Sequence, residues 1–301
     1  MADFKPQVVD ILTTLKNHEM GFKSRAYKTA LESIAPLPSI RCISDVEGLK
    51  GVGDKIREKI REIIATGTLS KIDALKADPK EQAKTAFLNI YGIGPVKASE
   101  LAETFESVEE LRAAVKAMPS VGILNDKQLI GLHYYEDLLE RIPRAEMLAH
   151  EALLKSVATV QMDVVGSFRR GAANSGDIDM LLCSSNKKTL DAMVDALTSR
   201  GYILETLAHG ANKFMGICAL EGGKSRRLDI LLTPPAKYGF ALLYFTGSQK
   251  YNIQVRQHAL TLGYSLSEHG LKGTDKSVPE LLTEKAIIEF LGLPFVAPEE
   301  R

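Results

Sequence analysis

The sequence predicts a multidomain protein of the α and α+β classes, with helical domains first and a domain built on a mixed sheet after them. Two glycine turns of similar context recur among helical patterns in the N-terminal third. Farther on, a glycine- and arginine-rich stretch over 166–179 joins two apolar runs, as a connection between strands does. A chain of 301 residues is long enough for several domains, each with its own buried core.

The composition is that of a soluble globular protein, with 45% hydrophobic and 25% charged residues. No apolar run approaches the ~20 residues of a membrane helix, and the N-terminus lacks the apolar core of a secretory signal. The three cysteines, Cys42, Cys183 and Cys218, form no zinc pattern and indicate a reducing, intracellular compartment. The 38 basic and 38 acidic residues argue against a uniformly basic surface but allow local basic patches.

The N-terminal region predicts a helical domain over residues 1–78. Apolar residues at helical spacing cover 6–36, where Pro36 and Pro38 end the run. Gly51-Val52-Gly53 then precedes a helix with isoleucines on its inner face, which is a helix-hairpin-helix pattern. These glycines would let backbone N–H groups approach a phosphate at the helix N-terminus, a contact that reads no base sequence.

A second hairpin of this kind is expected at Gly92 and Gly94, in a helical subdomain over 79–140. One Gly-x-Gly turn alone is often only a tight connection between helices. Two copies in matched context favour phosphate binding, and Pro95 suits the first turn of the following helix. Further helices are predicted over 103–142, 145–157, 188–200 and part of 279–296, and a strand pair over 204–220.

Lys55 and Lys59 lie four residues apart and therefore share one helix face. Like charges at this spacing cost a few tenths of a kcal/mol. One explanation is a solvated basic face that grips DNA phosphates. The other is that one amine is a nucleophile, because cationic neighbours favour the neutral amine that attacks a carbonyl to give a Schiff base.

The stretch over 166–179 contains two carboxylates that alternation places on one face of a strand, Asp177 and Asp179. At ~4 Å and an effective dielectric near 20 their repulsion is roughly 4 kcal/mol, which a divalent cation would offset. An isolated Asp-x-Asp is more often a solvated strand or turn. Here Ser167 and Arg170 lie just upstream and can hold phosphate oxygens.

A third carboxylate, Asp229, lies within an apolar strand-like run, where burial is costly unless the group is coordinated or paired. If its strand is adjacent, it could meet Asp177 and Asp179, and three carboxylates suit two Mg²⁺ ions ~3.5–4 Å apart. The alternative is a salt bridge to Arg226 or Arg227. A paired-metal site beside an anion cradle indicates nucleotidyl transfer.

An aromatic segment follows, in which Gly247 permits a backbone bend beside Tyr244 and Phe245. The two rings could flank a sugar and a base, or could simply pack in the core. Asn252 and Arg256 are four residues apart on the next helix and could face the same groove.

Together these motifs resemble those of the family X DNA polymerases over nearly the whole chain. The motifs are Leu49–Ile56, Gly92–Pro95, Gly166–Asp179, Arg227–Asp229 and Tyr244–Ser248. The resemblance implies a 5′-deoxyribose-phosphate lyase domain over 1–78 and a DNA-binding subdomain over 79–140. It also implies a nucleotidyltransferase-type catalytic palm over 141–245 and a small α+β thumb for nucleotide selection over 246–301.

The resemblance also implies roles for individual residues. Asp177, Asp179 and Asp229 would bind two Mg²⁺ or Mn²⁺ ions, with Asp229 as the base for the primer 3′-hydroxyl. The nucleotide-binding residues would be Arg144, Gly166, Ser167, Arg170, Ser175, Gly176, Tyr244, Phe245, Gly247 and Asn252. The DNA-binding residues would be Phe22, Lys23, Tyr27, Lys55, Lys71, Gly51, Gly53, Gly92, Gly94, Arg227 and Arg256.

For the lyase reaction, the resemblance places Lys59 as the Schiff-base lysine, with Lys23, Tyr27, Lys55 and Lys71 binding the 5′-phosphate and sugar. Backbone carbonyls of the hairpin loops would bind Na⁺ or K⁺; they are those of Leu49, Val52, Leu88, Ile90 and Ile93.

The chain departs from the beta-type members of the family at four positions. Leu231 stands where an arginine helps to switch the palm between states. Gln249 and Ile253 replace polar or charged residues near the incoming base, which affects nucleotide affinity and fidelity. Phe22 stands where a histidine stacks on template DNA, and stacking could survive this change.

The predicted function is template-directed DNA synthesis that fills short gaps in base excision repair, with 5′-deoxyribose-phosphate lyase activity. The alternatives are a template-independent nucleotidyltransferase, resembling terminal transferase or tailing RNA, and a non-catalytic DNA-end-binding protein. The three aspartates argue against the last. We expect a monomer that binds gapped or nicked DNA and dNTPs and meets base excision repair proteins but no membrane, in the nucleus or another DNA-containing compartment.

Overall fold

The computed structural model describes residues 2–19, 21–273 and 277–301, apart from the side chains of Leu75 and Lys76. The chain forms two compact units, Met1–Ile123 and Leu124–Arg301. None of the helices in these described ranges combines the length and the apolar character that crossing a bilayer requires.

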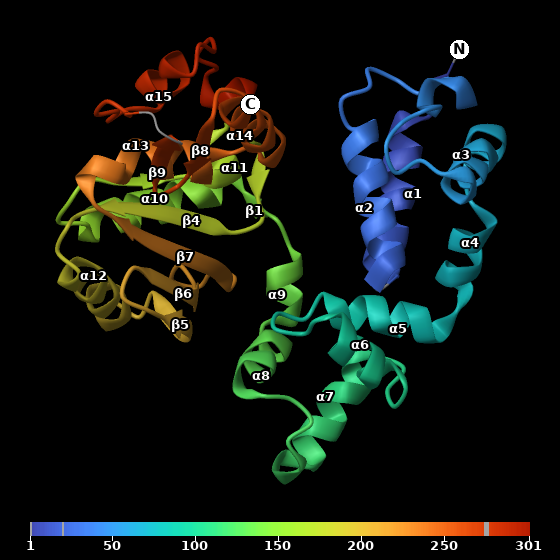
Figure 1. Cartoon of the computed structure of the whole chain (residues 1–301). Helices are drawn as coiled ribbons and strands as arrows, with labels where there is room; N and C mark the ends of the chain where they lie inside the picture. The colour runs from blue at the N-terminus through green and yellow to red at the C-terminus, as the bar shows by residue number, and fades with distance from the viewer. Residues whose placement is uncertain (1, 20, 274–276) are drawn as a thin grey trace. The chain divides into compact units, whose positions relative to one another are not determined.

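Among the described residues of the first unit, every regular element is a helix (Figure 1). Its elements are α1 (Lys5–His18), α2 (Gly21–Ile34), the 3₁₀ turn η1 (Ile43–Val46), α3 (Asp54–Thr66), α4 (Ser70–Ala77), α5 (Pro79–Leu88), α6 (Pro95–Ala102), α7 (Val108–Ala117) and the 3₁₀ turn η2 (Pro119–Val121). The helical run predicted over 6–36 is two helices, because Glu19 is extended at the end of α1 and Gly21, with φ 63°, begins α2. Buried side chains from α1 to α4 and the loops between them, most of them aliphatic, form the core of its N-terminal part.

Both predicted hairpins are present in this unit. In each, the second glycine is the N-cap of the following helix: Gly53 for α3 and Gly94 for α6. The first glycine has a positive φ, 84° at Gly51 and 85° at Gly92. A Cβ on Gly51 would lie 2.9 Å from the backbone nitrogen of Ala30, so only glycine lets this turn pack against α2.

The second unit begins with α8 (Asp126–His133) and α9 (Tyr135–Leu139). There follow β1 (Ile142–Pro143), α10 (Arg144–Val157), β2 (Met162–Val164), α11 (Gly166–Arg169), β3 (Asn174–Ser175), β4 (Ile178–Cys183), α12 (Lys188–Ser199), β5 (Ile203–His209), β6 (Lys213–Cys218) and β7 (Arg226–Thr233). The predicted helices over 145–157 and 188–200 correspond to α10 and α12, and the strand pair over 204–220 is β5 and β6.

The predicted mixed sheet is confirmed. Its order is β2-β4-β7-β6-β5, with β4 and β7 parallel and the other neighbours antiparallel. Figure 1 labels the last four of these strands. Alternation gives the two central strands one face whose side chains, such as Met180 and Ile230, pack with α10 and α12 in the main core. The opposite face, with Leu181 and Leu231, packs with α13 (Pro235–Thr246).

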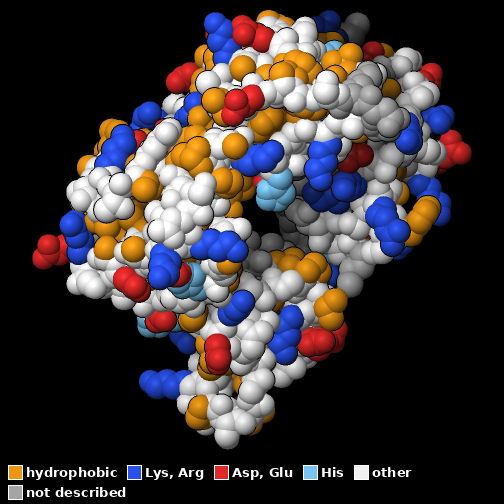
Figure 2. All heavy atoms as spheres, turned by 60° about the vertical axis from the view of Figure 1, so that its left-hand side comes forward, with side chains coloured by type: hydrophobic (Ala, Val, Ile, Leu, Met, Phe, Trp, Pro, Cys, Tyr) orange, Lys and Arg blue, Asp and Glu red, His pale blue; other side chains and the backbone are white. Residues whose placement is uncertain are grey.

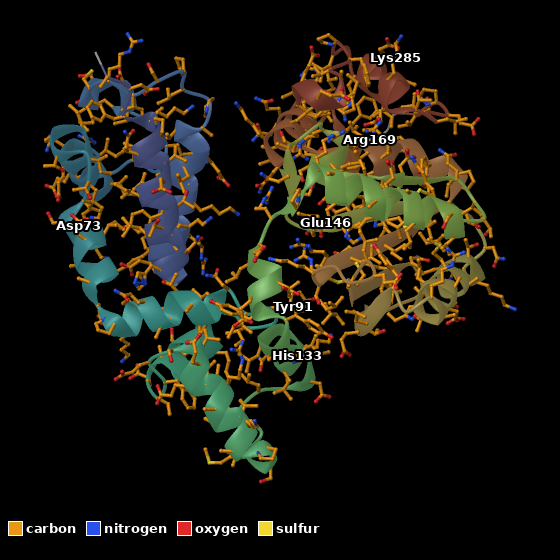
Figure 3. The ribbon with its side chains drawn as sticks, turned by 180° about the vertical axis from the view of Figure 1, so that it is seen from behind. Asp73, Tyr91, His133, Glu146, Arg169 and Lys285 are labelled. Atoms are coloured by element: carbon orange, nitrogen blue, oxygen red, sulfur yellow. The ribbon has the colours of Figure 1, made fainter. Side chains whose placement is uncertain are left out.

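A small α+β subdomain ends the chain, as predicted. It contains α14 (Gln249–Thr261), β8 (Tyr264–Ser267), β9 (Gly270–Gly273), α15 (Glu284–Phe290) and the 3₁₀ turn η3 (Pro298–Glu300), packed around its own core with α13. A salt bridge joins it to α11: Arg169, labelled in Figure 3, pairs with Glu284 of α15 at 2.6 Å. Arg301 pairs with the same carboxylate at 2.7 Å.

Candidate functional site

The two central strands bring together carboxylates that are far apart in the sequence. β4 and β7 run parallel, and Asp179 is the register partner of Asp229. Both side chains lie on the α13 side of the sheet, the face opposite the main core, because they alternate with the core residues Met180 and Ile230. Asp177 precedes β4 and lines the same cavity as Asp179.

A glycine makes room for the central carboxylate. Gly166 begins α11 with φ 63°, and a Cβ built there would lie 2.5 Å from Oδ2 of Asp179. No L side chain fits that backbone conformation and that space together. The glycine at the start of the predicted connection is therefore fixed by its contact with the carboxylate.

Two cations pair with two of the three carboxylates of this site, Asp177 and Asp229. Arg227 Nη2 donates to Asp177 Oδ2, and Arg227 Nε lies 3.7 Å from Asp229 Oδ1. Lys213 of β6, which the sequence did not indicate, lies 3.4 Å from Asp229 Oδ2. The predicted alternative of an Asp229–Arg227 ion pair is thus present, whereas the neighbouring Arg226 points to the other face and binds Glu146, labelled in Figure 3, at 2.6 Å.

The donor set fits a divalent ion. Burial, and then the negative charge of Asp229, raise the pKa of Asp179 to about 6. Asp229 Oδ1 is buried and has no hydrogen-bond partner. Carboxylate oxygens are the ligands that Mg²⁺ prefers. Over the described residues no three acidic, His or Cys side chains are already gathered as a metal site, since Asp177 is turned toward Arg227.

A cavity of about 720 Å³ opens beside Asp177 and Asp179, whereas Asp229 lines a smaller neighbouring one. Residues from β4, α11, α13, α14, the loops between them and the segment before β1 line it: Arg141, Gly166, Ser167, Arg170, Gly176, Asp177, Asp179, Tyr244, Phe245, Gly247, Gln249, Asn252, Ile253 and Arg256. Most of the residues predicted to bind a nucleotide therefore surround one space.

The predicted phosphate cradle is arranged in two layers. Ser167 and Arg170 line the cavity, whereas Ser175 is buried behind it and its hydroxyl accepts a 3.0 Å hydrogen bond from Ser167. Arg170 Nη1 donates to the carbonyl of Thr246 at 2.6 Å, which ties the cradle to the end of α13. Ser175 is thus placed to orient Ser167.

The two arginines around β1 differ from the prediction. Arg144, predicted to contact phosphate, does not line the cavity; it donates to the carbonyls of Phe168 at 3.0 Å and Ala172 at 3.3 Å. Its guanidinium also lies 4.8 Å from the Phe168 ring centroid. Arg141, which the sequence reasoning missed, lines the cavity instead, held by Asn174 Oδ1 at 2.8 Å.

The Arg141 assignment has a geometric reason. Pro143 pairs with Asn174 in the short β1–β3 ladder, so the residues before β1 and after β3 reach the same side of the cavity. Arg141 Nη1 lies 3.1 Å from where a Cβ on Gly176 would be. A two-residue strand has no periodicity, so the sequence carried no signal for this placement.

The aromatic segment forms the opposite wall. Tyr244 and Phe245 stand edge to face, with ring centroids 5.1 Å apart, and both line the cavity. Asn252 Nδ2 donates to the carbonyl of Tyr244 at 2.6 Å. Of the departures from the family pattern, Gln249 and Ile253 line this cavity, and Leu231 lines a smaller one with Asp179 and Asp229.

In the first unit, three residues predicted to contact a 5′-phosphate or sugar gather around a carboxylate. Glu19 binds Lys71 at 2.5 Å and Lys23 at 3.4 Å. Tyr27 is part of this cluster, and its pKa is raised mainly by burial, with the charge of Lys71 opposing. The sequence reasoning missed Glu19.

The other predicted contacts of this unit differ in exposure: Lys55 is exposed and Lys59 is half-buried. Lys59 Nζ donates to the carbonyl of Lys55 at 3.1 Å on α3. Phe22, near the start of α2, is 84% exposed, so its ring is free to stack on a base.

The hairpin loops share one turn. Val52 N–H donates to the Leu49 carbonyl and Ile93 N–H to the Ile90 carbonyl, each at 3.1 Å. Nothing lies within 4 Å of a Cβ built on Gly53 or Gly94, so a ligand backbone could approach both positions. Figure 2 shows basic side chains interspersed with acidic and apolar ones on the face drawn there, without a uniform basic coat.

Comparison with known families gives four consecutive matches. A helix-hairpin-helix domain model matches residues 4–69, and the model of the fingers domain of DNA polymerase lambda matches 85–139. The DNA polymerase beta palm model matches 141–235, and the DNA polymerase beta thumb model matches 241–301. A helix-hairpin-helix domain followed by a palm and a thumb agrees with the fold class expected from the sequence motifs.

Curated relatives point the same way. DNA polymerase lambda of Rattus norvegicus is 33% identical over 84% of this chain and 48% of its own length. DNA polymerase lambda of Arabidopsis thaliana is 30% identical over 93% of this chain and 58% of its own length. DNA nucleotidylexotransferase of Gallus gallus is 28% identical over 88% of this chain and 60% of its own length. The chain thus spans about half the length of the relatives it matches.

Proposed function

Because this chain belongs to the family X DNA polymerases, we propose that it is a template-directed DNA polymerase that fills short gaps during base excision repair. Its substrates are a primer 3′-hydroxyl on gapped or nicked DNA and a dNTP. The observation that carries the proposal is the register pairing of Asp179 with Asp229 beside a cavity that also holds Asp177, Ser167 and Arg170.

In the proposed reaction, the cavity holds the dNTP, and the carboxylates on β4 and β7 lie at the reacting phosphate and the primer 3′-hydroxyl. Ser167, Arg170 and Arg141 contact the triphosphate, and Tyr244 and Phe245 flank the sugar. Asp177, Asp179 and Asp229 would hold divalent ions, which would neutralise the charge on the reacting phosphate and the leaving group. Asp229 accepts the proton of the primer 3′-hydroxyl. The primer 3′-oxygen then bonds to the α-phosphorus of the dNTP, and the bond from that phosphorus to pyrophosphate breaks.

Asp229→Asn in a gap-filling assay tests the polymerase proposal. The substrate is duplex DNA with a one-nucleotide gap and a 5′-phosphate, with Mg²⁺ present or chelated. We expect the variant and the chelated wild type to lose at least roughly a hundredfold in rate, because three carboxylates act as one unit. Undiminished synthesis by Asp229→Asn would refute the assignment.

We also propose a 5′-deoxyribose-phosphate lyase activity in the first unit. The neutral amine of Lys59 adds to the sugar aldehyde, and water leaves as the Schiff base forms. Loss of a C2′ proton then breaks the C3′–O bond and releases the DNA end. Lys23, Tyr27, Lys55 and Lys71 bind the phosphate and sugar in this scheme, and the hairpin loops hold Na⁺ or K⁺.

Borohydride reduction of the Schiff base tests the lyase separately. Wild-type protein on a 5′-deoxyribose-phosphate end should give a covalent adduct, and Lys59→Ala should not. Full trapping by Lys59→Ala would remove Lys59 from this role without touching the polymerase proposal.

The match to DNA nucleotidylexotransferase favours one second candidate, template-independent nucleotide addition. A single-stranded primer offered without template separates the two functions. Extension of that primer at the rate seen on gapped DNA would favour the second candidate.

A further inference from the structure

The carboxylate of Glu19 occupies the space between two lysines from different helices. Its Oε1 lies 2.5 Å from Lys71 Nζ of α4, and its Oε2 lies 3.4 Å from Lys23 Nζ of α2. Each carboxylate oxygen thus takes one ammonium group. The Glu19 side chain is only 19% exposed, whereas those of Lys71 and Lys23 are 44% and 70% exposed.

The cluster is electrostatically organised around this one anion. The hydrogen bond from Lys71 lowers the pKa of Glu19, and the same bond raises the pKa of Lys71. Two ammonium groups and one carboxylate leave a net charge of about +1 in a site that also contains the partly buried Tyr27. A phosphate monoester carries about −1.5 to −2 at neutral pH and offers the same two-oxygen contact.

We propose that Glu19 acts as an internal substitute for the 5′-phosphate. Before the phosphate can bind, Glu19 must release Lys23 and Lys71. This inference rests on the proposed function, in which these two lysines bind the 5′-phosphate of a gap. The carboxylate stabilises the cationic pair while DNA is absent and competes with the phosphate when it arrives. Because a phosphate carries more charge than a carboxylate, the exchange favours the DNA end.

This competition predicts the direction in which affinity for a 5′-phosphorylated DNA end changes when Glu19 is altered. Removing the charge of Glu19 should strengthen binding of a 5′-phosphorylated end, although it removes two ion pairs from the folded protein. Partly exposed ion pairs contribute modestly, so the expected gain in affinity is about two- to fivefold. A purely structural role for Glu19 predicts the opposite sign, since disordered lysines would bind the end less well.

The test measures dissociation constants by fluorescence anisotropy on two gapped duplexes that differ only in a 5′-phosphate or 5′-hydroxyl. The readout is the ratio of the two constants for wild type, Glu19→Gln and Glu32→Gln. Glu32 is the matched control, because it pairs with Lys28 on α2 at 4.0 Å and is 61% exposed. It reports the general effect of removing one negative charge.

We expect Glu19→Gln to raise the preference for the 5′-phosphate about two- to fivefold. The same variant should unfold at a lower temperature. The control Glu32→Gln should leave the preference unchanged. Adding Lys71→Met to Glu19→Gln should abolish the gain. An unchanged or reduced preference in Glu19→Gln would overturn the proposal. If the wild type binds the two duplexes equally well, the proposed 5′-phosphate site at Lys23 and Lys71 is wrong as well. The polymerase proposal is unaffected, because the gap-filling assay tests it separately.

Discussion

At the scale of single residues, the site depends on which side chain is absent as much as on which is present. Gly166 leaves the space that Asp179 fills, and its φ of 63° excludes ordinary side chains. Arg226 and Arg227 are neighbours in the sequence, yet alternation along β7 directs one to a buried ion pair and the other to the acidic site. Two arginines that are adjacent in the sequence therefore have different roles, because their side chains lie on opposite faces of β7.

Gly166→Ala should disrupt the acidic site rather than the fold. The new Cβ would lie 2.5 Å from Asp179 Oδ2, so the carboxylate must move. A displacement of this size costs roughly a hundredfold in rate where reacting groups need exact placement. We expect kcat on gapped DNA to fall by about that factor, as measured by single-nucleotide incorporation.

Gly201→Ala is the matched control for this change. Gly201 also has a positive φ, 70°, but nothing lies within 4 Å of its Cβ position. Both variants carry the backbone strain of about 1–2 kcal/mol, and only Gly166→Ala should lose kcat. Equal losses in the two variants would show that strain, not contact with Asp179, controls activity.

Arg141 and Arg144 should respond differently to truncation. Arg141 lines the cavity, so Arg141→Ala should raise the KM for dNTP by about 10- to 100-fold through loss of a charged contact to phosphate. Arg144 holds the carbonyls of Phe168 and Ala172, so Arg144→Ala should lower the free energy of unfolding by about 1–3 kcal/mol. Steady-state kinetics and urea unfolding of both variants check this, and a KM effect confined to Arg144→Ala would contradict it.

The residue scale also shows where sequence reasoning ends. Asp177, Asp179 and Asp229 were recognisable because carboxylates in apolar strand-like runs are unusual. Arg141, Lys213 and Glu19 were not, since each acts through a partner that is distant in the chain: Asn174, Asp229 and Lys71. Charged residues of that kind are common on surfaces, and only the fold shows which ones meet.

At the scale of elements, a buried ion pair anchors α9 and α10 to the sheet. Arg226 is 3% exposed and binds both oxygens of Glu146, at 2.6 and 2.9 Å. The same guanidinium donates to the carbonyls of Asp137 and Glu140 at the end of α9. Because Arg227 follows directly, this anchor also fixes the start of the strand that carries Asp229.

Glu146→Gln should therefore destabilise the sheet in a pH-dependent way. Breaking a largely buried pair costs about 3 kcal/mol. The hydrogen bond from Arg226 lowers the pKa of Glu146 below its usual 4.5 in the folded protein. Its contribution is fully present above pH 4.5 and is lost as the pH falls through the lowered value.

Urea unfolding from pH 6 downward, following the sheet-containing unit, measures this contribution. The wild type should exceed Glu146→Gln by about 3 kcal/mol at pH 6, and the difference should shrink below pH 4.5. A difference that stays constant down to acid pH would show that the carboxylate charge is not what stabilises this anchor.

Elements differed in how far the sequence could predict them. Long periodic segments such as α10, α12 and the β5–β6 pair were predictable from their spacing. The four-residue α11 and the two-residue strands β1 and β3 were not, because they are too short to show a period. They nevertheless position Ser167, Ser175 and Arg141, so the local geometry of the cradle came only from the structure.

At the scale of the whole molecule, charge balance constrains how DNA is held. The chain has 38 basic and 38 acidic residues, so long-range attraction to DNA is weak and binding must rest on local contacts. The described contacts fit this, since Lys23, Lys71, Arg227 and Lys213 are each paired with a carboxylate. Under the proposed function, DNA phosphates or divalent ions would have to replace these internal partners, which would limit unspecific binding.

The salt dependence of DNA binding should reflect this small number of contacts. Each phosphate contact on duplex DNA adds about −0.9 to the slope of log K against log salt. We expect a shallow slope, between about −3 and −5, for wild type on gapped DNA with a 5′-phosphate, measured by anisotropy. Lys23→Met should reduce its magnitude by about 0.9, because one phosphate contact is lost. Lys28→Met is the control on the same helix, since Lys28 is 69% exposed, close to the 70% of Lys23, but lies outside the Glu19 cluster. If Lys28→Met changes the slope as much as Lys23→Met, DNA is held by a diffuse basic surface, and the discrete lysine site in the first unit is wrong.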